Sequence, residues 1–442
     1  MSLSIPIKRK LAQGWPSISL RHAAEISNST VDKKSYEDEL PVLLCNYTDV
    51  YYNEKITSRL SFMPATATRI EFERFLLLEG DVIITKDSES WNDIGVPACV
   101  DESLSDVVCG YHLCLLRPKK DILNGLYLLR ALQSVGVREQ LWMAARGVTR
   151  FGLGLDGIKS LEFPLPPLPA QKAIANFLDR KTAAIDALIE KKEKLLELLA
   201  EKRSALINQA VTKGLDPNVP MKDSGIPWLG EIPEHWESKP SKYVLDFVTS
   251  GSRGWSEYFS DFGSIFLQSG NLVGNLKVDF DNVQRVEPPQ NAEGARTRVR
   301  VGDVLVCITG GLTGNVGIVE GVPEVTFVNQ HLGLLRPVKN EIDSKFLALQ
   351  LASLVGQLHF QMVQYGGTKK GLSLTDLKNV GLAVPPITEQ FSIVEAVENQ
   401  LARISMARDK SESQISLLRE YRQSLITAAV TGQLEIPTEE YE

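Results

Sequence analysis

The chain has 442 residues and a formal net charge of −7, with 43% hydrophobic and 23% charged residues, 32 glycines and 22 prolines. This length allows about three domains, and the composition excludes wholesale disorder and fibrous repeats. No apolar run approaches the roughly 20 residues that cross a bilayer, and the amino-terminal segment lacks the apolar stretch of a signal peptide. Five cysteines without regular spacing fit a reducing compartment, so we expect a soluble cytoplasmic protein without a membrane partner.

The amino-terminal part of the chain mixes short apolar runs with turn-forming residues. Asp81–Thr85 (DVIIT) has the composition of a buried strand and is bounded by Gly80 and by a polar pair. A proline-rich break, LEFPLPPLPAQ, follows near residue 165. From Ala170 to Thr212 there is neither Pro nor Gly, and Leu, Ala, Glu and Lys dominate. This segment predicts a single helix roughly 65 Å long at 1.5 Å per residue.

The second half of the chain shows the same order of elements. Asp303–Ile308 (DVLVCI) and Glu324–Val328 (EVTFV) predict strands, and the break LAVPPITEQ precedes a second helix from Glu389 to Thr431. The expected fold class is α+β, with two mixed α/β domains that are each followed by a long helix. We place the two mixed domains at residues 1–165 and 217–384, and the two helical regions at residues 166–216 and 385–442.

An internal repeat explains this order. His112–Pro118 (HLCLLRP) matches His331–Pro337 (HLGLLRP) 219 residues later, and Gly147–Leu155 (GVTRFGLGL) matches Gly366–Leu374 (GGTKKGLSL) at the same offset. PPLPAQ likewise matches PPITEQ, and RSALINQAVTKGL matches RQSLITAAVTGQL. A period this long describes a tandem of whole domains with approximate internal two-fold character, because solenoid repeats have periods of 20–50 residues.

Each predicted helix carries an apolar stripe that it cannot bury alone. The repeat supplies a second helix of the same length, so we expect an antiparallel intramolecular coiled coil. The alternative is that each helix packs against its own domain. The predicted seam consists of Ile174, Leu178, Ile185, Leu188, Leu195, Leu199 and Leu206 in the first helix, with Ile393, Val397, Ile404, Leu418 and Leu425 in the second.

Two short motifs resemble cofactor-binding and metal-binding sites, but the surrounding sequence speaks against both. GLGLDG at Gly152–Gly157 matches a dinucleotide-binding pattern, but prolines soon after it forbid the required helix. Cys109, His112 and Cys114 are possible zinc ligands by residue type, but the second copy keeps only His331. We therefore expect no metal, no cofactor and no catalytic residue in this chain.

The pattern as a whole resembles the specificity subunit of type I restriction-modification enzymes. The resemblance rests on the Pro-Pro-x-x-x-Gln start of both helices, on DSGIPWLGEIPEHW at Asp223–Trp236, on Gly366–Gln390 and on RQSLITAAVTGQL near the end of the chain. These motifs are specific in combination and cover essentially all of the chain.

This resemblance implies a non-catalytic subunit that reads DNA. Each mixed domain is then a target recognition domain for one half of a bipartite sequence in double-stranded DNA. The two helices separate the readers and dock methyltransferase subunits, of which we expect two. Those partners supply the S-adenosylmethionine chemistry, and a motor-nuclease subunit joins them for cleavage.

The charge distribution limits where DNA can be held. Neither recognition domain is basic overall, so any positive surface must be local. Gln140–Leu155 contains cations and no acid, and so does Ser344–Thr375, which includes Lys345; Arg296, Arg298 and Arg300 form a further cluster. A Gly-rich loop with a hydroxyl and a cation suits contact with phosphate, or else is a tight connection with a solvated charge. The predicted phosphate-contacting residues are Arg146, Thr149, Arg150, Thr368, Lys369 and Lys370.

Base readout is expected where the two copies differ, because two half-sites require different donors and acceptors. Each of these side chains is also an ordinary surface or loop residue by type. The candidates are Lys86, Trp91 and Asn92 in the first copy, and Arg253, Trp255, Gln268, Thr309, Thr313 and Asn315 in the second.

A function of another class competes with DNA reading. The chain could be a coiled-coil scaffold whose mixed domains bind proteins, and its negative net charge favours that hypothesis. The Gly-Thr-basic loop present in both copies favours the DNA reader instead.

Overall fold

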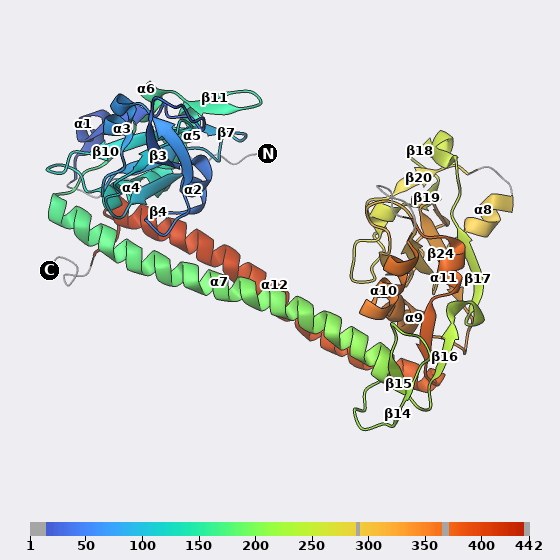
Figure 1. The fold of residues 1–442 in the computed structure, drawn as a ribbon. Helices are drawn as coiled ribbons and strands as arrows, with labels where there is room; N and C mark the ends of the chain where they lie inside the picture. Colours follow the sequence, from blue (N-terminus) through green and yellow to red (C-terminus); the bar gives the residue numbers. More distant parts are fainter. Residues whose placement is uncertain (1–14, 289–291, 365–370, 437–442) are drawn as a thin grey trace. The chain divides into compact units, whose positions relative to one another are not determined.

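The chain divides into two compact units, each assembled from separated stretches of sequence. In the computed structural model, which describes residues 15–288, 292–364 and 371–436, Met1–Glu193 and Glu412–Glu442 form the first unit, and Lys194–Ser411 forms the second. Each unit holds one mixed domain, the first half of the long helix that follows it and the last half of the other long helix (Figure 1).

A five-stranded sheet forms the centre of the first unit. Its order is β2-β10-β6-β8-β4, and all neighbours are antiparallel except β4 and β8. The strands are β2 (Ala24–Asn28), β4 (Lys55–Ile56), β6 (Val82–Thr85), β8 (Pro97–Val100) and β10 (Leu113–Pro118). Strands β6 and β8 are buried along their whole length, which is why they read as continuous apolar runs.

Smaller sheets and short helices surround this centre. A sheet of order β5-β3-β9 contains the parallel pair β3 and β9, and two further sheets have the orders β1-β13 and β11-β12-β7. Their strands are β1 (Ser17–Ser19), β3 (Leu40–Cys45), β5 (Met63–Ala67), β7 (Asp87–Ser88), β9 (Val107–Cys109), β11 (Ala145–Gly147), β12 (Phe151–Leu153) and β13 (Glu162–Pro164). The helices are α1 (Leu20–Ala23), α2 (Tyr47–Tyr52), α3 (Arg69–Phe75), α4 (Gly125–Gln133), α5 (Val135–Ala144) and α6 (Leu155–Lys159).

The second unit repeats this plan. Its sheet β17-β24-β21-β22 has the order of β2-β10-β6-β8, and the parallel pair β19 and β23 corresponds to β3 and β9. Its strands are β14 (Met221–Asp223), β15 (Glu231–Pro233), β16 (Glu237–Pro240), β17 (Leu245–Ser250), β18 (Phe259–Ser260), β19 (Ser264–Leu267), β20 (Gln284–Val286), β21 (Val304–Cys307), β22 (Val316–Ile318), β23 (Thr326–Val328), β24 (Leu332–Pro337) and β25 (Gly381–Val384). Its helices are α8 (Ala292–Thr297), α9 (Ser344–Ala352), α10 (Leu354–Val363) and α11 (Leu374–Lys378). The predicted internal repeat and the α+β class are therefore confirmed.

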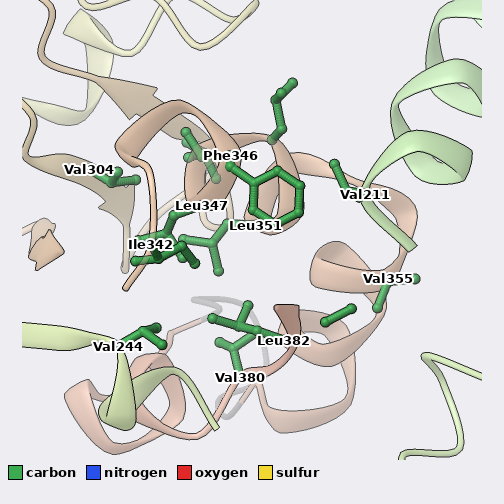
Figure 2. Packing of buried hydrophobic residues seen from close by; sticks show 14 of the residues in the cluster. Val211, Val244, Val304, Ile342, Phe346, Leu347, Leu351, Val355, Val380 and Leu382 are labelled. Carbon is green, nitrogen blue, oxygen red and sulfur yellow. The ribbon is translucent and has the colours of Figure 1, made fainter. Parts of the chain in front are cut away.

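The core of the second unit joins its domain to the end of the first long helix. Val211 of that helix packs in the same buried cluster as Phe346, Leu351 and Val355 from α9 and α10 (Figure 2). The described residues contain no single helix that is long and apolar enough to cross a membrane. The bent pair α9 and α10 reaches the required length and apolarity, and its buried apolar side chains belong to this cluster.

Both long helices are present close to the predicted bounds. Helix α7 spans Leu168–Lys213 and helix α12 spans Ile387–Val430. Helix α7 begins two residues earlier than expected, because Pro169 fits the first turn, where its missing N–H has no intrahelical acceptor.

The two long helices pair in antiparallel fashion within each unit. In the first unit Lys192 of α7 donates to Gln414 of α12 over 2.7 Å, while the earlier residue Asp186 accepts from the later residue Arg422 over 2.8 Å. In the second unit Ile207 near the end of α7 shares a core with Ile393 near the start of α12. The predicted antiparallel pairing is confirmed, and each helix start also packs on its own domain.

The seam between the helices departs from the predicted one at two leucines. Leu188 and Leu195 are 43% and 41% exposed, so their assignment to the seam is wrong. The buried stripe instead follows an 11-residue spacing, through Ile174, Ile185 and Ile207 in α7 and through Ile393, Ile404, Ile415 and Ile426 in α12. Eleven residues over three turns give 3.67 residues per turn, close to the geometry of a straight α-helix. The other predicted seam residues are buried (Leu178, Val397 and Leu425) or half-buried (Leu199, Leu206 and Leu418).

The glutamine of each Pro-Pro-x-x-x-Gln motif joins its helix to its domain. Gln171 is fully buried; its Oε1 accepts the backbone N–H of Asn124 over 2.8 Å, and its Nε2 donates to the carbonyls of Ile122 and Pro166 over 2.9 and 2.8 Å. Gln390 is equally buried, and its side chain makes the matching bonds to Asp343, Glu341 and Pro385. The motif is therefore structural: it fixes the direction in which the helix leaves the domain.

A network of charged residues ties the first domain to both helices of its unit. The guanidinium of Arg130, which is 2% exposed, contacts Glu54 over 2.8 Å and Asp179 of α7 over 2.7 Å. Glu54 also contacts Arg422 of α12 over 2.5 Å, and Asp179 contacts Lys55 over 2.9 Å. Burial disfavours the charge of Glu54, but Arg130 and Arg422 outweigh it and hold the pKa of Glu54 below its usual value.

Candidate nucleic-acid interface

Four predicted DNA-contacting residues of the first unit come together on one small sheet. Strands β11 and β12 form a hairpin, and β12 also pairs with β7, so that Gly152 lies opposite Asp87. This pairing places Lys86, next to β7, beside the hairpin that carries Arg146, Thr149 and Arg150. The last three are exposed, and Lys86 is half-buried. Figure 1 shows the β11 hairpin reaching past the neighbouring strands of its unit.

Gly147 fixes the shape of the hairpin tip. Its φ is +146°, and a Cβ added there would lie 1.9 Å from the backbone oxygen of Arg150. No other residue fits this position without moving the backbone. The chain of the three-residue tip Val148–Arg150 therefore turns back so closely on Gly147 that this position requires glycine.

A histidine stabilises the base of this sheet in both units. The ring Nδ1 of His112 lies 2.8 Å from Oδ2 of Asp87, the residue of β7 that faces Gly152. In the second unit His331 contacts Thr309, and Thr309 forms a bridge with Gly371. The repeat thus keeps the pairing geometry although the partner of the histidine changes.

The cations of this sheet differ from the structural cations of the same unit. Among the described residues Lys86, Arg146 and Arg150 have no ion-pair partner. Arg117, by contrast, is paired with the buried carboxylate of Asp81 at 2.8 Å. Unpaired, accessible cations on one hairpin suit contact with an anionic backbone.

Trp91 and Asn92 lie in the connection between β6 and β8, next to β7. Trp91 is 51% exposed, and its ring lies edge-on against Trp142 with centroids 6.1 Å apart. Asn92 is exposed and accepts from Ser90 Oγ over 2.6 Å. Asn92 also borders a cavity of about 290 Å³ that is lined by Trp142 and Arg138.

The cavity does not offer a free cation. The guanidinium of Arg138 stacks 4.9 Å from the Trp142 ring and donates to Gln423 over 2.8 Å. Burial lowers the pKa of Arg138. In the same cavity the Tyr51 hydroxyl donates to Asp93 over 2.7 Å, and this bond with burial raises the pKa of Tyr51 to about 12.

In the second unit three predicted readers lie in the matching connection. Thr309, Thr313 and Asn315 occupy the segment between β21 and β22, which corresponds to the Lys86–Val96 segment of the first unit. All three are half-buried. Gly310 and Gly314 in this segment adopt φ values of +98° and +96°, so the glycine-rich sequence serves tight turns.

The remaining predicted readers of the second unit are separated from that segment. Trp255 is 3% exposed and stacks on Phe266 with centroids 5.6 Å apart, so it belongs to a hydrophobic cluster and its assignment to base contact is corrected. Gln268 is the N-cap residue of the short helix Ser269–Asn271, and its backbone N–H donates to Oδ1 of Asn271 over 2.8 Å. Arg253 is exposed in the segment after β17. Thr368, Lys369 and Lys370 lie outside the described residues.

Two further cationic candidates of the sequence serve the fold. Lys345 contacts Glu320 over 2.9 Å and Glu398 over 2.5 Å, and these contacts raise its pKa to about 12. Arg296 donates to the backbone oxygen of Ser250 over 2.9 Å. Neither Lys345 nor Arg296 is an unpaired surface cation.

Both cysteines of the cysteine-histidine motif lie in the core. Cys109 and Cys114 are buried thiols, and burial raises the pKa of Cys114 to about 12 and that of Cys109 well above its usual value. Within the described part of the chain, no three His, Cys, Asp or Glu side chains come together as metal ligands.

One exposed residue of the hairpin escapes the sequence criteria. Val148 is 90% exposed at the tip between Arg146 and Arg150. Because the candidates for DNA contact were chosen among polar, charged and aromatic side chains, a valine was not among them. The signal that reveals it is the repeat: the second copy has Gly367 at this position within an otherwise similar motif.

Comparison with known proteins identifies relatives along the whole chain. A family model described as type I restriction modification DNA specificity domain matches residues 14–198 and 297–415. The type I restriction enzyme EcoBI specificity subunit of Escherichia coli is 24% identical over 95% of this chain and 86% of its own length. The EcoKI specificity subunit of Escherichia coli K12 is 23% identical over 96% of this chain and 90% of its own.

Solved structures share the fold. A chain from a study of complex assembly and conformational transition of the type I R-M system has a TM-score of 0.69 at 19% identity, covering 96% of this chain and 100% of that one. The HsdS subunit from Thermoanaerobacter tengcongensis has a TM-score of 0.58 at 18% identity, covering 97% of this chain and 99% of that one.

Proposed function

Because the chain belongs to the type I restriction modification DNA specificity domain family, we propose that it is the DNA sequence-specificity subunit of a restriction-modification complex. One observation carries the proposal. The same domain occurs twice, and in both copies a residue in contact with a histidine pairs with the glycine that follows a Gly-Thr-basic motif: Asp87 with Gly152, and Thr309 with Gly371. In the first copy that loop presents unpaired cations, which suits binding to the DNA backbone.

Two readers on one chain imply a target in two parts. In this proposal residues 1–165 read one half of an asymmetric double-stranded DNA site, and residues 217–384 read the other. The helical regions 166–216 and 385–442 set the unread gap between the half-sites. The connection between β6 and β8 and the matching connection between β21 and β22 carry different residues, which then contact different bases.

The proposed partners supply the chemistry. Methyltransferase subunits, two per chain, dock on the long helices and bind S-adenosylmethionine, and motor-nuclease subunits join for cleavage. This chain contributes recognition alone, binds no cofactor and acts in the cytoplasm. The names of the relatives, which are specificity subunits of restriction enzymes, support this division of labour.

A coiled-coil scaffold that binds proteins instead is the weaker hypothesis. Its support is the net charge of −7, which opposes binding to phosphate. It gives no reason for unpaired cations to gather on the β11–β12 hairpin of the first domain. Family membership also favours the DNA reader.

Genome-wide methylation mapping tests the proposal. A methylation-free host expresses the chain with its cognate methyltransferase subunit, and the control strain lacks the chain. We expect two short motifs separated by a fixed unread gap, which disappear in the control. A stable complex that methylates no such motif and shows no DNA binding in gel shifts supports the scaffold hypothesis instead.

A charge reversal on the hairpin tests the site itself. Arg150→Glu in the assembled complex is expected to weaken DNA binding and to lower the salt dependence, log K against log salt, by about 1 per lost phosphate contact. Arg69→Glu is the matched control, since Arg69 is 86% exposed but paired with Glu73. Equal DNA affinity of both variants, with intact assembly, argues against this hairpin as a phosphate contact.

A further inference from the structure

We infer that Val148 is a specificity-determining residue of the first recognition domain, which contacts a thymine methyl group in the major groove while Arg146 and Arg150 hold the adjacent phosphates. The inference rests on the proposed function. It assigns to the hairpin β11–β12 a role in base readout in addition to backbone contact.

The position of Val148 is unusual for an apolar side chain. Single exposed apolar residues are common on protein surfaces, so exposure of 90% alone proves little. Tight turns, however, normally carry Gly, Asn, Asp, Ser or Pro. Here a valine occupies the tip of a hairpin, with an exposed arginine two residues away on each side.

The hairpin holds Val148 in a fixed place. The backbone oxygen of Arg150 approaches Gly147 so closely that only glycine fits there. Phe151 pairs with both Gly147 in β11 and Ser88 in β7. The contact between His112 and Asp87 secures the base of β7. A residue on a rigid ribbon loses little conformational entropy when it binds, so a small apolar contact can contribute to affinity.

The dimensions and charge of the hairpin suit the major groove. The groove admits a two-stranded β-ribbon, and the thymine C5 methyl is the apolar group that it presents. The segment Gln140–Leu155 contains no acidic residue to repel the phosphates. Arg146 and Arg150 have no ion-pair partner among the described residues, so both remain available to flank the groove.

The internal repeat separates the shared role of the hairpin from the specific one. Thr149, the cation at 150 and Gly152 recur as Thr368, Lys369 and Gly371. Val148 is replaced by Gly367, which has no side chain to offer a base. The recurring threonine and cation fit contact with phosphates, which every DNA site presents, whereas base readout requires different groups in the two readers. Val148 differs between the copies, and so does Arg146, which corresponds to Tyr365.

Replacement of thymine by deoxyuridine tests the contact directly, since it removes only the methyl group. Methylation by the wild-type complex is measured on a series of duplexes. In each duplex, deoxyuridine replaces a single thymine of the first half-site. We expect one position to lower methylation at subsaturating DNA about three- to fivefold, the effect of one lost methyl contact. Val148→Gly, which copies the second repeat, is expected to be equally slow on thymine and deoxyuridine at that position.

Matched controls make the outcome decisive. Ile70→Ala alters another exposed β-branched residue of the same domain, 78% exposed on α3, and must retain the wild-type response. If no position shows a deoxyuridine effect that depends on Val148, the inference is overturned while the proposed function stands. If the Val148→Gly variant melts like wild type but no longer co-purifies with the methyltransferase, the hairpin tip serves partner docking, and the inference is overturned as well. A wild-type complex that methylates no bipartite site refutes the proposed function and this inference together.

Discussion

At the scale of single residues, the glutamine that begins each long helix shows how a short motif fixes a large element. Gln171 satisfies one backbone donor and two backbone acceptors at the junction of domain and helix. Because the site is fully buried, no water replaces these bonds when the side chain is lost. The prolines before it deprive the junction of backbone donors, so the side chain takes over that role.

Gln171→Ala is expected to destabilise the first unit by about 3 kcal/mol or more, because buried polar groups left unpaired cost about 1–3 kcal/mol each. Hydrogen exchange of the first unit measures the loss. Lys172→Ala, one residue on and exposed, serves as the control and is expected to change stability by less than about 0.5 kcal/mol. Equal protection in both variants contradicts the structural role.

Sequence reasoning at this scale succeeded where chemistry is local and failed where it depends on neighbours. Arg150 was singled out as the cation of a repeated motif and Lys86 as a cation where the two copies differ, and both lie beside the same small sheet, as a nucleic-acid site requires. Trp255 and Lys345 have equally suitable side chains, but tertiary packing buries the first, and two glutamates pair with the second. Burial and pairing between distant segments cannot be read from one segment.

At the scale of elements, the length of the long helices follows from the sequence, whereas the face that they bury does not. The absence of Pro and Gly is a local property and determines the helix bounds within two residues. The seam was predicted with a heptad period of 3.5. A straighter helix drifts by about 20° per heptad from that period, enough to expose Leu188 and Leu195.

Two neighbouring substitutions in α7 distinguish the periods. Ile185→Ala, on the 11-residue stripe, is expected to cost about 2–3 kcal/mol. Leu188→Ala, on the heptad stripe but 43% exposed, is expected to cost less than about 1 kcal/mol. Thermal unfolding of the two variants under identical conditions compares them. A larger loss of thermal stability for Leu188→Ala than for Ile185→Ala supports the heptad seam instead.

The charged network between α4, α7 and α12 makes the first unit sensitive to acid. Burial disfavours the charge of Asp179, but Arg130 and Lys55 outweigh it and hold the pKa of Asp179 below its usual value. A carboxylate with a lowered pKa adds stability above its unfolded value, near 4 for Asp and Glu, and loses it as the pH falls further. We expect the melting temperature of the first unit to fall between pH 5 and pH 3.

Asp179→Asn is expected to melt lower at pH 7 and to show a shallower decline towards pH 3, because one of the titrating carboxylates is gone. Glu197→Gln is the control, as Glu197 forms an exposed i,i+3 pair with Lys194. An unchanged slope for Asp179→Asn means that the network does not govern the acid response.

At the scale of the whole molecule, the net charge of −7 works against binding to DNA. The cationic hairpin is small, so the isolated chain is expected to bind random DNA weakly and to lose that binding in moderate salt. Gel shifts of the isolated chain and of its complex, at 50 and 200 mM salt, check this. Tight, salt-resistant binding by the isolated chain contradicts the view that partners add most phosphate contacts.

The internal repeat made the global fold predictable, because one domain description applies twice. The assignment of chain segments to the two units was not predictable from the repeat. The hydroxyl of Tyr127 in the first unit donates to the carbonyl of Pro164 over 2.7 Å and lies 3.5 Å from the carbonyl oxygen of Val430. Gln350 in the second unit donates to the matching carbonyls of Ala383 and Val211. Different residues make the same link, so the repeat hides it from sequence comparison.

The composition of the first unit has a consequence for synthesis on the ribosome. This unit needs residues 412–430 of α12, which are made after the entire second unit. At about 5–20 residues per second, translation of residues 194–411 takes roughly 10–45 s. During that interval Ile185 and Ile189 lack the helix that covers them, so the nascent chain presents an apolar stripe to chaperones and to other copies until residues 412–430 emerge.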